Sequence, residues 1–206
     1  MNVLWQCPPD AVAAIVLAHG AGAGMSHVSM QAIADAFERQ ALATLRFNFP
    51  FIEAGKNRTD SQAVATTSIA AAFEEAKGRT MLPLWLGGHS FGGRMSSHAA
   101  LDQLVDPAGL IFCSFPLHMP KKPSCSRAEH LSSIRQPMLF MSGTRDALAE
   151  RDSLQQVIEK LPTAELHWLE TADHGYRILK RTRANPENVF DEMARVARTF
   201  IERSGP

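Results

Sequence analysis

A serine between glycines, in the stretch Gly88-His89-Ser90-Phe91-Gly92, is the residue of this chain best suited to act as a nucleophile. The G-x-S-x-G spacing suits a sharp turn, because glycines two positions before and after the serine remove Cβ atoms that would collide. An apolar run before the turn predicts a buried strand, and the residues after it predict a helix. Such a turn would push the Ser90 hydroxyl above the edge of a sheet, at the positive end of that helix.

A serine hydroxyl needs a base to take its proton, and the base needs an anion that fixes its tautomer and stabilises its charge. Two loops later in the chain supply candidates for both partners. Asp146 follows the apolar run 137–142, and His174 follows the apolar run 164–169. We therefore predict Ser90 as the nucleophile, His174 as the base and Asp146 as the acid that orients the base.

Other residues compete for these roles. His167 lies within a predicted strand, where a side chain is more often packed than free to reach a substrate. His118 lies on another strand-end loop and is therefore the stronger competitor for the base. Asp173 is adjacent to the predicted base, but a neighbour on the same loop rarely aligns its carboxylate with the imidazole edge. Asp152 is expected on a helix. His89, inside the turn, is expected to be a packing or hydrogen-bonding neighbour and not a second base.

The tetrahedral intermediate of such a reaction carries an oxyanion, which needs N–H donors that are already in place. We expect one donor to be the backbone N–H of Phe91. The other should come from the glycine-rich segment after the first long strand, with Ala21 preferred and Gly22 in reserve. The glycines of that segment could also serve only the conformation of a strand-to-helix turn, and both explanations can hold together.

Two glycine-rich segments resemble nucleotide-binding loops, but both depart from those motifs. Segment 88–95 lacks the lysine and the hydroxyl of a phosphate-binding loop. The glycines at 20, 22 and 24 lack the third glycine at the spacing of a dinucleotide loop, and the next strand is followed by Asn48 where an acidic residue would grip a ribose. A nucleotide-binding protein is therefore the lesser alternative, and no cofactor or metal is expected.

Short apolar runs alternate with amphipathic segments along the chain, which predicts an α/β fold with a mostly parallel sheet covered on both faces. We predict strands at 12–18, 43–49, 83–87, 109–114, 137–142 and 164–169, and helices at about 27–40, 60–77, 92–105, 126–133 and 149–160. A last helix is expected after Asn185-Pro186, with an apolar stripe of Val189, Met193, Val196 and Phe200. Ligands of such sheets sit at the carboxyl ends of the strands, where the predicted nucleophile, acid and base all lie.

The composition favours a single globular domain over residues 1–206. Apolar residues make up 45% of the chain, charged residues 20%, and the formal net charge is zero, so neither a nucleic acid nor a membrane is indicated as a partner. The three cysteines have no C-x-x-C spacing, so no disulfide framework or zinc site is indicated. A basic, apolar leader is lacking, and a cytoplasmic location is expected. Nothing in the sequence decides between a monomer and a homodimer.

These motifs together resemble the α/β-hydrolase superfamily, specifically its small members without a cap that are related to dienelactone hydrolases and carboxylesterases. The likeness extends from about Ala13 to the last helix and includes the order of Ser90, Asp146 and His174. It implies a three-layer α/β/α sandwich with six or seven strands, because the segment before Ala13 is too short for two leading strands. Dienelactone hydrolases use a cysteine nucleophile, so Ser90 shifts the expectation toward ordinary ester chemistry.

The resemblance implies a serine hydrolase that cleaves a small-molecule ester or thioester through an acyl-enzyme. Only a loop and one short helix separate the predicted strands 109–114 and 137–142, so no cap domain is expected. The pocket should then be shallow and open, with a lining of Met25, His27, Phe49, Phe51, Leu117, His118 and Met119. The alternative is an interaction module that has kept the scaffold while catalysis is vestigial.

Overall fold

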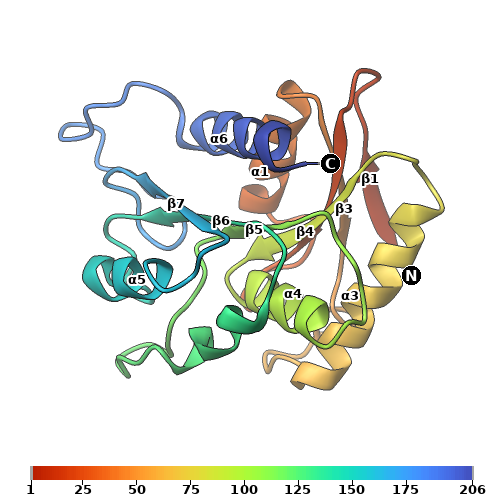
Figure 1. Ribbon diagram of the computed structural model, residues 1–206, viewed down its shortest axis with the longest axis horizontal. Helices are drawn as coiled ribbons and strands as arrows, with labels where there is room; N and C mark the ends of the chain where they lie inside the picture. The colour runs from red at the N-terminus through yellow and green to blue at the C-terminus, as the bar shows by residue number, and fades with distance from the viewer. Residues whose placement is uncertain (1, 206) are drawn as a thin grey trace.

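Figure 1 shows the computed structural model, which describes residues 2–205 and has a seven-stranded sheet between two layers of helices. The strands are β1 (Val3–Gln6), β2 (Ala13–Ala18), β3 (Leu42–Phe47), β4 (Leu84–His89), β5 (Leu110–Cys113), β6 (Met138–Gly143) and β7 (Ala164–Leu169). Their spatial order is β1-β3-β2-β4-β5-β6-β7, with β1 antiparallel to β3 and all other neighbours parallel. Because β3 and β4 flank β2 on opposite sides, the loops after β2 and β4 open at a topological switch point, where ligands of such sheets bind.

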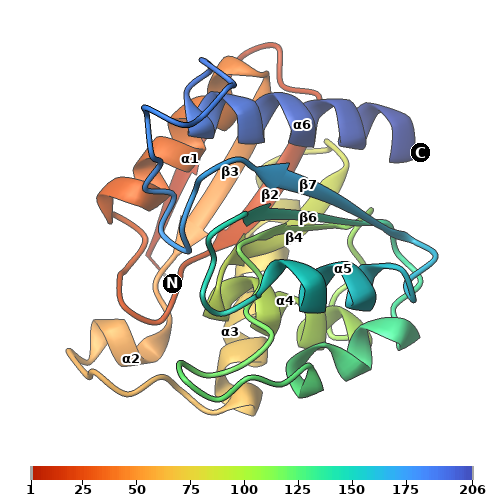
Figure 2. The ribbon, with the colours of Figure 1, turned by 90° about the vertical axis from the view of Figure 1, so that its left-hand side faces the viewer.

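Helices cover both faces of the sheet, which gives the three-layer α/β/α sandwich that the sequence predicts. One face carries α1 (Val28–Arg39) and α6 (Val189–Ser204), and the other carries α3 (Gln62–Lys77), α4 (Phe91–Leu101) and α5 (Arg151–Ile158), as Figures 1 and 2 show. A short helix α2 (Pro50–Glu53) follows β3, and the 3-10 helix η1 (Ser126–Ser133) lies beside α4. Residues 114–137 between β5 and β6 hold a loop and η1. Within residues 2–205, no helix is long and apolar enough to cross a membrane.

Coverage on both faces explains why the strands read as continuous apolar runs. Every residue of β2 and β3 is buried. On the side of α1 and α6, the core contains Phe37 and Trp85, and the Trp85 ring meets Phe200 edge-on with 5.7 Å between the ring centroids. On the other side, Phe73 from α3 and Met95 from α4 pack against the sheet. Burying an apolar side chain of this size stabilises the fold by roughly 1.5–3 kcal/mol. These contacts hold the helices on the sheet and thereby fix the position of the sheet edge that carries the site.

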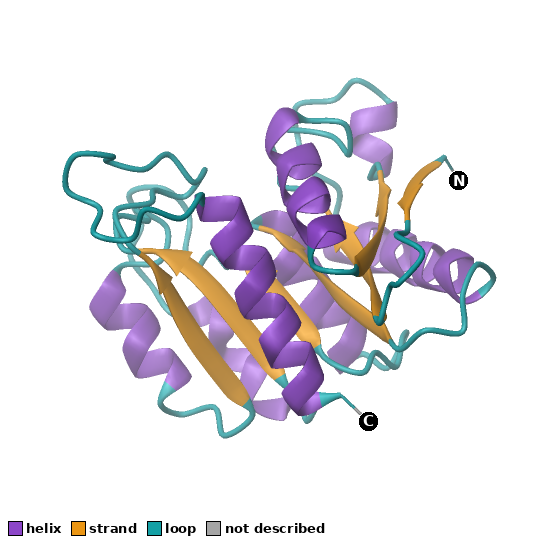
Figure 3. Cartoon of the chain, turned by 90° about the horizontal axis from the view of Figure 1, so that it is seen from above, coloured by secondary structure: helices purple, strands orange, loops and turns teal. Residues whose placement is uncertain are grey.

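Helix α6 packs on one face of the sheet over β6 and β7 and runs alongside the strands, as Figure 3 shows from above. Its predicted apolar stripe is confirmed: three of its four members are buried, and Val196 is partly buried against the same core cluster. The predicted start at Asn185-Pro186 is wrong, because the helix begins three residues later. Asn188 is the N-cap, and its side chain accepts a hydrogen bond from the N–H of Phe190 at 2.9 Å. The side chain of Asn185 instead accepts from the N–H of Glu187, within the turn that precedes the helix.

The six predicted strands are confirmed, with ends shifted by at most two residues, and β1 is the seventh. Strand β3 ends before Phe49 because that residue is the N-cap of the unpredicted helix α2, with Pro50 at its first position. Helix α4 ends at Leu101 and not at 105, because Gln103 takes a left-handed conformation with φ of 55°. The predicted helix at 126–133 is present as a 3-10 helix.

Candidate active site

The turn that carries Ser90 connects β4 directly to α4. Ser90 has φ of 51° and ψ of −112°, a conformation that a residue with a side chain rarely adopts. A Cβ atom at Gly88 would lie 2.2 Å from the carbonyl oxygen of Ala18, and one at Gly92 would lie 2.4 Å from the same oxygen. Both positions therefore require glycine so that the turn can pack directly against the end of β2. The N–H of Ser90 donates to the carbonyl of Cys113 at 3.0 Å, which fixes the turn to β5 as well.

Ser90, His174 and Asp146 lie in one hydrogen-bonded row. His174 Nε2 is 2.8 Å from Ser90 Oγ, and His174 Nδ1 is 2.9 Å from Oδ1 and 2.8 Å from Oδ2 of Asp146. A carboxylate only accepts, so Nδ1 carries the proton and Nε2 presents its lone pair to the serine hydroxyl. The Asp146 side chain is fully buried and also accepts from the N–H of Leu148 at 2.8 Å. The row can therefore move a proton from Ser90 to His174 while a buried anion faces the other edge of the ring.

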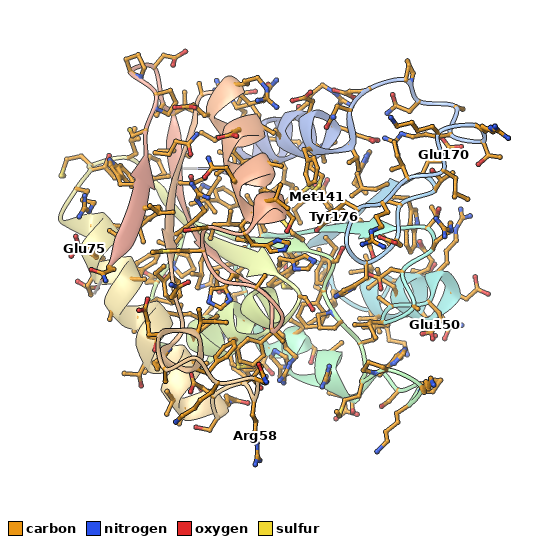
Figure 4. All side chains as sticks on the ribbon, turned by 180° about the vertical axis from the view of Figure 1, so that it is seen from behind. Arg58, Glu75, Met141, Glu150, Glu170 and Tyr176 are labelled. Atoms are coloured by element: carbon orange, nitrogen blue, oxygen red, sulfur yellow. The ribbon has the colours of Figure 1, made fainter. Side chains whose placement is uncertain are left out.

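His89 holds the loop that carries His174. Its Nε2 lies 3.0 Å from the carbonyl oxygen of His174, and a carbonyl only accepts, so this nitrogen donates. Burial lowers the pKa of His89 to about 4, which keeps the ring neutral at pH 7. The His89 ring also packs beside Tyr176. Tyr176 is buried in the core cluster that contains Met141, and Figure 4 labels Tyr176 and Met141. His89 is thus the hydrogen-bonding neighbour that the sequence predicts.

A buried histidine also anchors the glycine-rich loop after β2. His19 Nδ1 donates to the carbonyl of Gly20 at 2.7 Å, and His19 Nε2 accepts from the N–H of Phe49 at 3.0 Å. Burial lowers the pKa of His19, in keeping with this neutral form. Ala21 and Gly22 of the same loop line the cavity next to Ser90. Both stay predictions as oxyanion donors.

The second predicted oxyanion donor heads helix α4. Phe91 is the first residue of α4, where the N–H groups have no partner within the helix and carry the positive end of its dipole. The Phe91 side chain is turned the other way, into the core, where its ring meets Phe49 edge-on at 5.3 Å between centroids. The side chain of Phe91 therefore does not bear on this role, and its backbone N–H stays a predicted oxyanion donor.

A cavity of about 950 Å³ opens beside Ser90. It is lined by residues 20–23, 27–30, 32, 89, 90, 145, 147, 148, 173–177 and 190. These come from the loops after β2, β4, β6 and β7 and from the first turns of α1 and α6. The switch point of the sheet, the hydrogen-bonded row and the cavity therefore coincide.

Of the seven predicted pocket residues, only His27 lines this cavity. The prediction is wrong for Phe49 and Phe51, which are fully buried because α2 turns both rings inward onto His19 and Phe91. The prediction for Met25 is also wrong, because this residue lies outside the lining of the cavity. Its backbone N–H donates to Oδ1 of Asn48 at 2.8 Å.

The loop after β5 is likewise not part of the cavity wall. Leu117 is buried in the core beneath α5 and η1, so its prediction as a pocket residue is wrong. The prediction for His118 is wrong too, because this side chain is buried, with Nε2 at 2.6 Å from Oε2 of Glu150. Figure 4 labels Glu150. Met119 is about half exposed on the same loop and lies outside the lining.

The competing residues have structural partners of their own. His167 Nε2 lies 2.9 Å from Oε1 of Glu192, which is buried and also pairs with Arg183. Asp173 accepts hydrogen bonds at Oδ1 from the N–H groups of Gly175 and Arg177, at 2.9 Å each. These contacts shape the loop after β7 and leave Asp146 as the carboxylate at the His174 ring.

Two arginines of the cavity were not predicted from the sequence. Arg145 precedes Asp146 and Arg177 follows His174 by three positions, and both line the cavity. The sequence signal that could have identified them was their position on the loops that carry Asp146 and His174. In the part of the chain that the structure describes, no group of three or more His, Cys, Asp or Glu side chains could hold a metal ion.

The chain is similar to known proteins in both sequence pattern and fold. A family model described as an alpha/beta hydrolase domain matches residues 11–202. Est1E from Butyrivibrio proteoclasticus, solved with bound ferulic acid, superposes with a TM-score of 0.78 at 15% identity, covering 98% of this chain and 94% of Est1E. A dienelactone hydrolase from Anabaena variabilis gives a TM-score of 0.76 at 16% identity, covering 99% and 92%. XC6422 from Xanthomonas campestris, described as a serine hydrolase without lid, gives 0.73 at 21% identity, covering 99% and 89%.

Proposed function

The chain belongs to the alpha/beta hydrolase family, and we propose that it is a serine hydrolase that cleaves carboxylic ester or thioester bonds through an acyl-enzyme. The observation that carries the proposal is the unbroken hydrogen-bonded path from Asp146 through His174 to Ser90 Oγ. This path supports Ser90 as the nucleophile, because a serine hydroxyl gains reactivity only when an oriented base can take its proton. The strained backbone of Ser90 supports the same role, since such strain is retained where a site requires it.

In the acylation step, Ser90 Oγ attacks the substrate carbonyl carbon while its proton moves to Nε2 of His174. The buried Asp146 carboxylate stabilises the imidazolium that forms. The carbonyl oxygen becomes an oxyanion, for which the N–H groups of Phe91 and Ala21 are the proposed donors. When the C–O or C–S bond breaks, His174 returns the proton to the leaving alcohol or thiol, and the acyl group stays on Ser90.

In the deacylation step, a water molecule takes the place of the leaving group. His174 Nε2 removes a proton from this water, whose oxygen attacks the acyl carbon. Collapse of the second tetrahedral intermediate breaks the bond to Ser90 Oγ, which regains its proton from His174. The open cavity beside Ser90 supports entry of both ester and water directly from solvent.

A series of para-nitrophenyl esters and thioesters with increasing acyl length tests the proposal. We expect the wild type to hydrolyse members of the series and Ser90→Ala to lose this activity while its circular dichroism stays unchanged. His167→Gln is the matched control, because His167 is bonded to Glu192 and lies outside the cavity lining. Folded wild type that turns over no ester or thioester would reject the proposal and favour an interaction module on the same scaffold.

A further inference from the structure

A group of four basic side chains lies between α4 and η1. Two of them, Arg94 and His98, belong to α4, and two, Arg127 and His130, belong to η1. None of the four lines the cavity beside Ser90. All four residues are partly exposed, so solvent reaches the group from outside that cavity.

The spacing of these residues puts them in two rows, one on each helix. Residues four apart on an α-helix share a face, as Arg94 and His98 do. Residues three apart on a 3-10 helix are eclipsed, as Arg127 and His130 are. The two histidine rings stack, with 3.9 Å between centroids and 15° between planes. Because each arginine comes one turn before its histidine, the stack brings both guanidinium groups to one part of the surface.

Neither arginine has a carboxylate partner among residues 2–205. The ion pairs of arginines in this range belong to other side chains. The Arg94 guanidinium makes no hydrogen bond there, and Arg127 uses only Nη1, which donates to the carbonyl of His118 at 3.0 Å. Burial and the neighbouring charge of Arg127 lower the pKa of Arg94. Two positive charges thus lie near each other, partly removed from water and without an anion.

Three carboxylates of neighbouring segments do not form an ion pair with either arginine. Glu150 is bound to a histidine of the loop after β5, with 2.6 Å between its Oε2 and the ring nitrogen Nε2. Asp102 lies one turn beyond His98 on α4, and its charge acts on that ring. Glu129 is exposed and lies off the row of Arg127, since residues two apart on a 3-10 helix point in different directions.

The histidines of the group are neutral at pH 7. Ser97 Oγ donates its one proton to the carbonyl of Arg94 at 2.7 Å, so it accepts from Nε2 of His130, also at 2.7 Å. Burial, His98 and Arg94 lower the pKa of His130 to about 4. Burial and Arg94 lower the pKa of His98 as well. The positive charge of the group therefore comes from the two arginines.

We propose that Arg94 and Arg127 bind a phosphate group at the surface between α4 and η1. A dianionic phosphate matches the two unpaired charges, and its oxygens accept from guanidinium forks in the planar, bidentate geometry that arginine provides. The site goes beyond the proposed function, because it lies outside the cavity and takes no part in acyl transfer. The phosphate can be the free ion or a monoester group on a larger molecule.

Titration calorimetry in a chloride buffer at pH 7.5 and fixed ionic strength tests the proposal. The probes are inorganic phosphate, phenyl phosphate as a monoester, and acetate as a monoanionic control. We expect one phosphate to bind per chain and acetate to bind more weakly. A lower dissociation constant for phenyl phosphate than for inorganic phosphate identifies a monoester as the ligand, and an equal or higher one identifies the free ion.

Variants locate the site. Arg94→Gln and Arg127→Gln should each weaken phosphate binding about tenfold, because each removes charge-assisted hydrogen bonds. Arg58→Gln is the matched control, since it removes the same charge from the exposed loop between α2 and α3, where Figure 4 labels Arg58. This variant should leave the dissociation constant unchanged at fixed ionic strength.

Urea unfolding separates anion binding from a structural role of Arg94. A partly buried charge without a partner costs stability, so in chloride buffer Arg94→Gln should unfold at the same urea concentration as the wild type or at a higher one. Added phosphate should raise the midpoint of the wild type much more than that of Arg94→Gln, because a ligand stabilises the state that binds it.

Four results would overturn the proposal: no saturable binding of phosphate, equally tight binding of acetate, the same loss in Arg58→Gln, or destabilisation of Arg94→Gln in chloride buffer, failure to fold included. A fifth concerns the place of binding. Loss of phosphate binding in Arg145→Gln and not in Arg94→Gln would put the anion in the cavity beside Ser90 and would overturn the proposal as well.

Discussion

The substitution Asp146→Asn tests the proton path most sharply, because the structure fixes how the amide must sit. Oδ1 of Asp146 accepts from the N–H of Leu148 at 2.8 Å, and Oδ2 lies 2.8 Å from His174 Nδ1. An asparagine keeps its oxygen at the Leu148 N–H, which puts its NH2 group at the position of Oδ2. That group donates to Nδ1, so His174 must carry its proton on Nε2 and can no longer accept one from Ser90.

The expected loss in kcat is about 10⁴-fold, or about 5 kcal/mol in activation free energy, since the dominant tautomer is the inactive one. Both neighbours of residue 146 keep a hydrogen-bond partner, so the free energy of unfolding should change by about 1 kcal/mol or less. The measurements are kcat with a chromogenic ester at neutral pH and a urea unfolding curve for each protein.

Asp173→Asn is the matched control for this experiment. The Asp173 oxygen that accepts from Gly175 and Arg177 is retained in the amide, and the hydrogen bonds of the His174 ring go to Asp146 and Ser90. We expect kcat to stay within about threefold of the wild type. Retention of kcat in Asp146→Asn, with a large loss in Asp173→Asn, would refute the assignment of the acid.

Two further predictions concern stability. Gly88→Ala should lower the free energy of unfolding by about 3 kcal/mol, because the new Cβ would lie 2.2 Å from a backbone carbonyl of β2. Gly22→Ala is the control and should change this free energy by less than about 0.5 kcal/mol, because no atom lies within 4 Å of the added Cβ. Equal urea midpoints for the two variants would contradict the packing at the turn. Burial lowers the pKa of His118, but hydrogen bonds to a backbone carbonyl and to Glu150 outweigh it and leave this pKa above its ordinary value of 6.5. The stabilisation is then complete below pH 6.5 and is lost as pH rises through the folded pKa. The stability difference between wild type and His118→Gln should therefore shrink as pH rises above 6.5, and a difference that stays constant would contradict this.

The fold could be predicted because buried parallel strands leave a strong signal in the sequence. The runs that became β2 and β6 are almost wholly apolar, and helices on both faces require that composition. The four-residue strand β1 carries no such signal. Its residues are only partly buried at the edge of the sheet, and its pairing with β3 depends on a contact about 40 positions away.

The positions of Ser90, Asp146 and His174 could be predicted because all three follow parallel strands, whose carboxyl ends meet at one edge. The walls of the cavity could not be predicted in the same way. Position after a strand does not say which way a side chain turns, and Phe49 and Phe51 turn inward because helix α2 begins between them. The side chains expected around the uncapped site were apolar or histidine, whereas charged side chains from the loops of Asp146 and His174 form part of its wall.

Labelling of Ser90 by a fluorophosphonate tests the central claim most directly, because the reagent reacts with a serine that a base activates. The account predicts a stoichiometric adduct on the folded wild type, located by mass spectrometry at Ser90, lost in Ser90→Ala and formed far more slowly in Asp146→Asn. Folded protein that takes up no label, or that carries it on another residue, would contradict the assignment of Ser90 as the nucleophile.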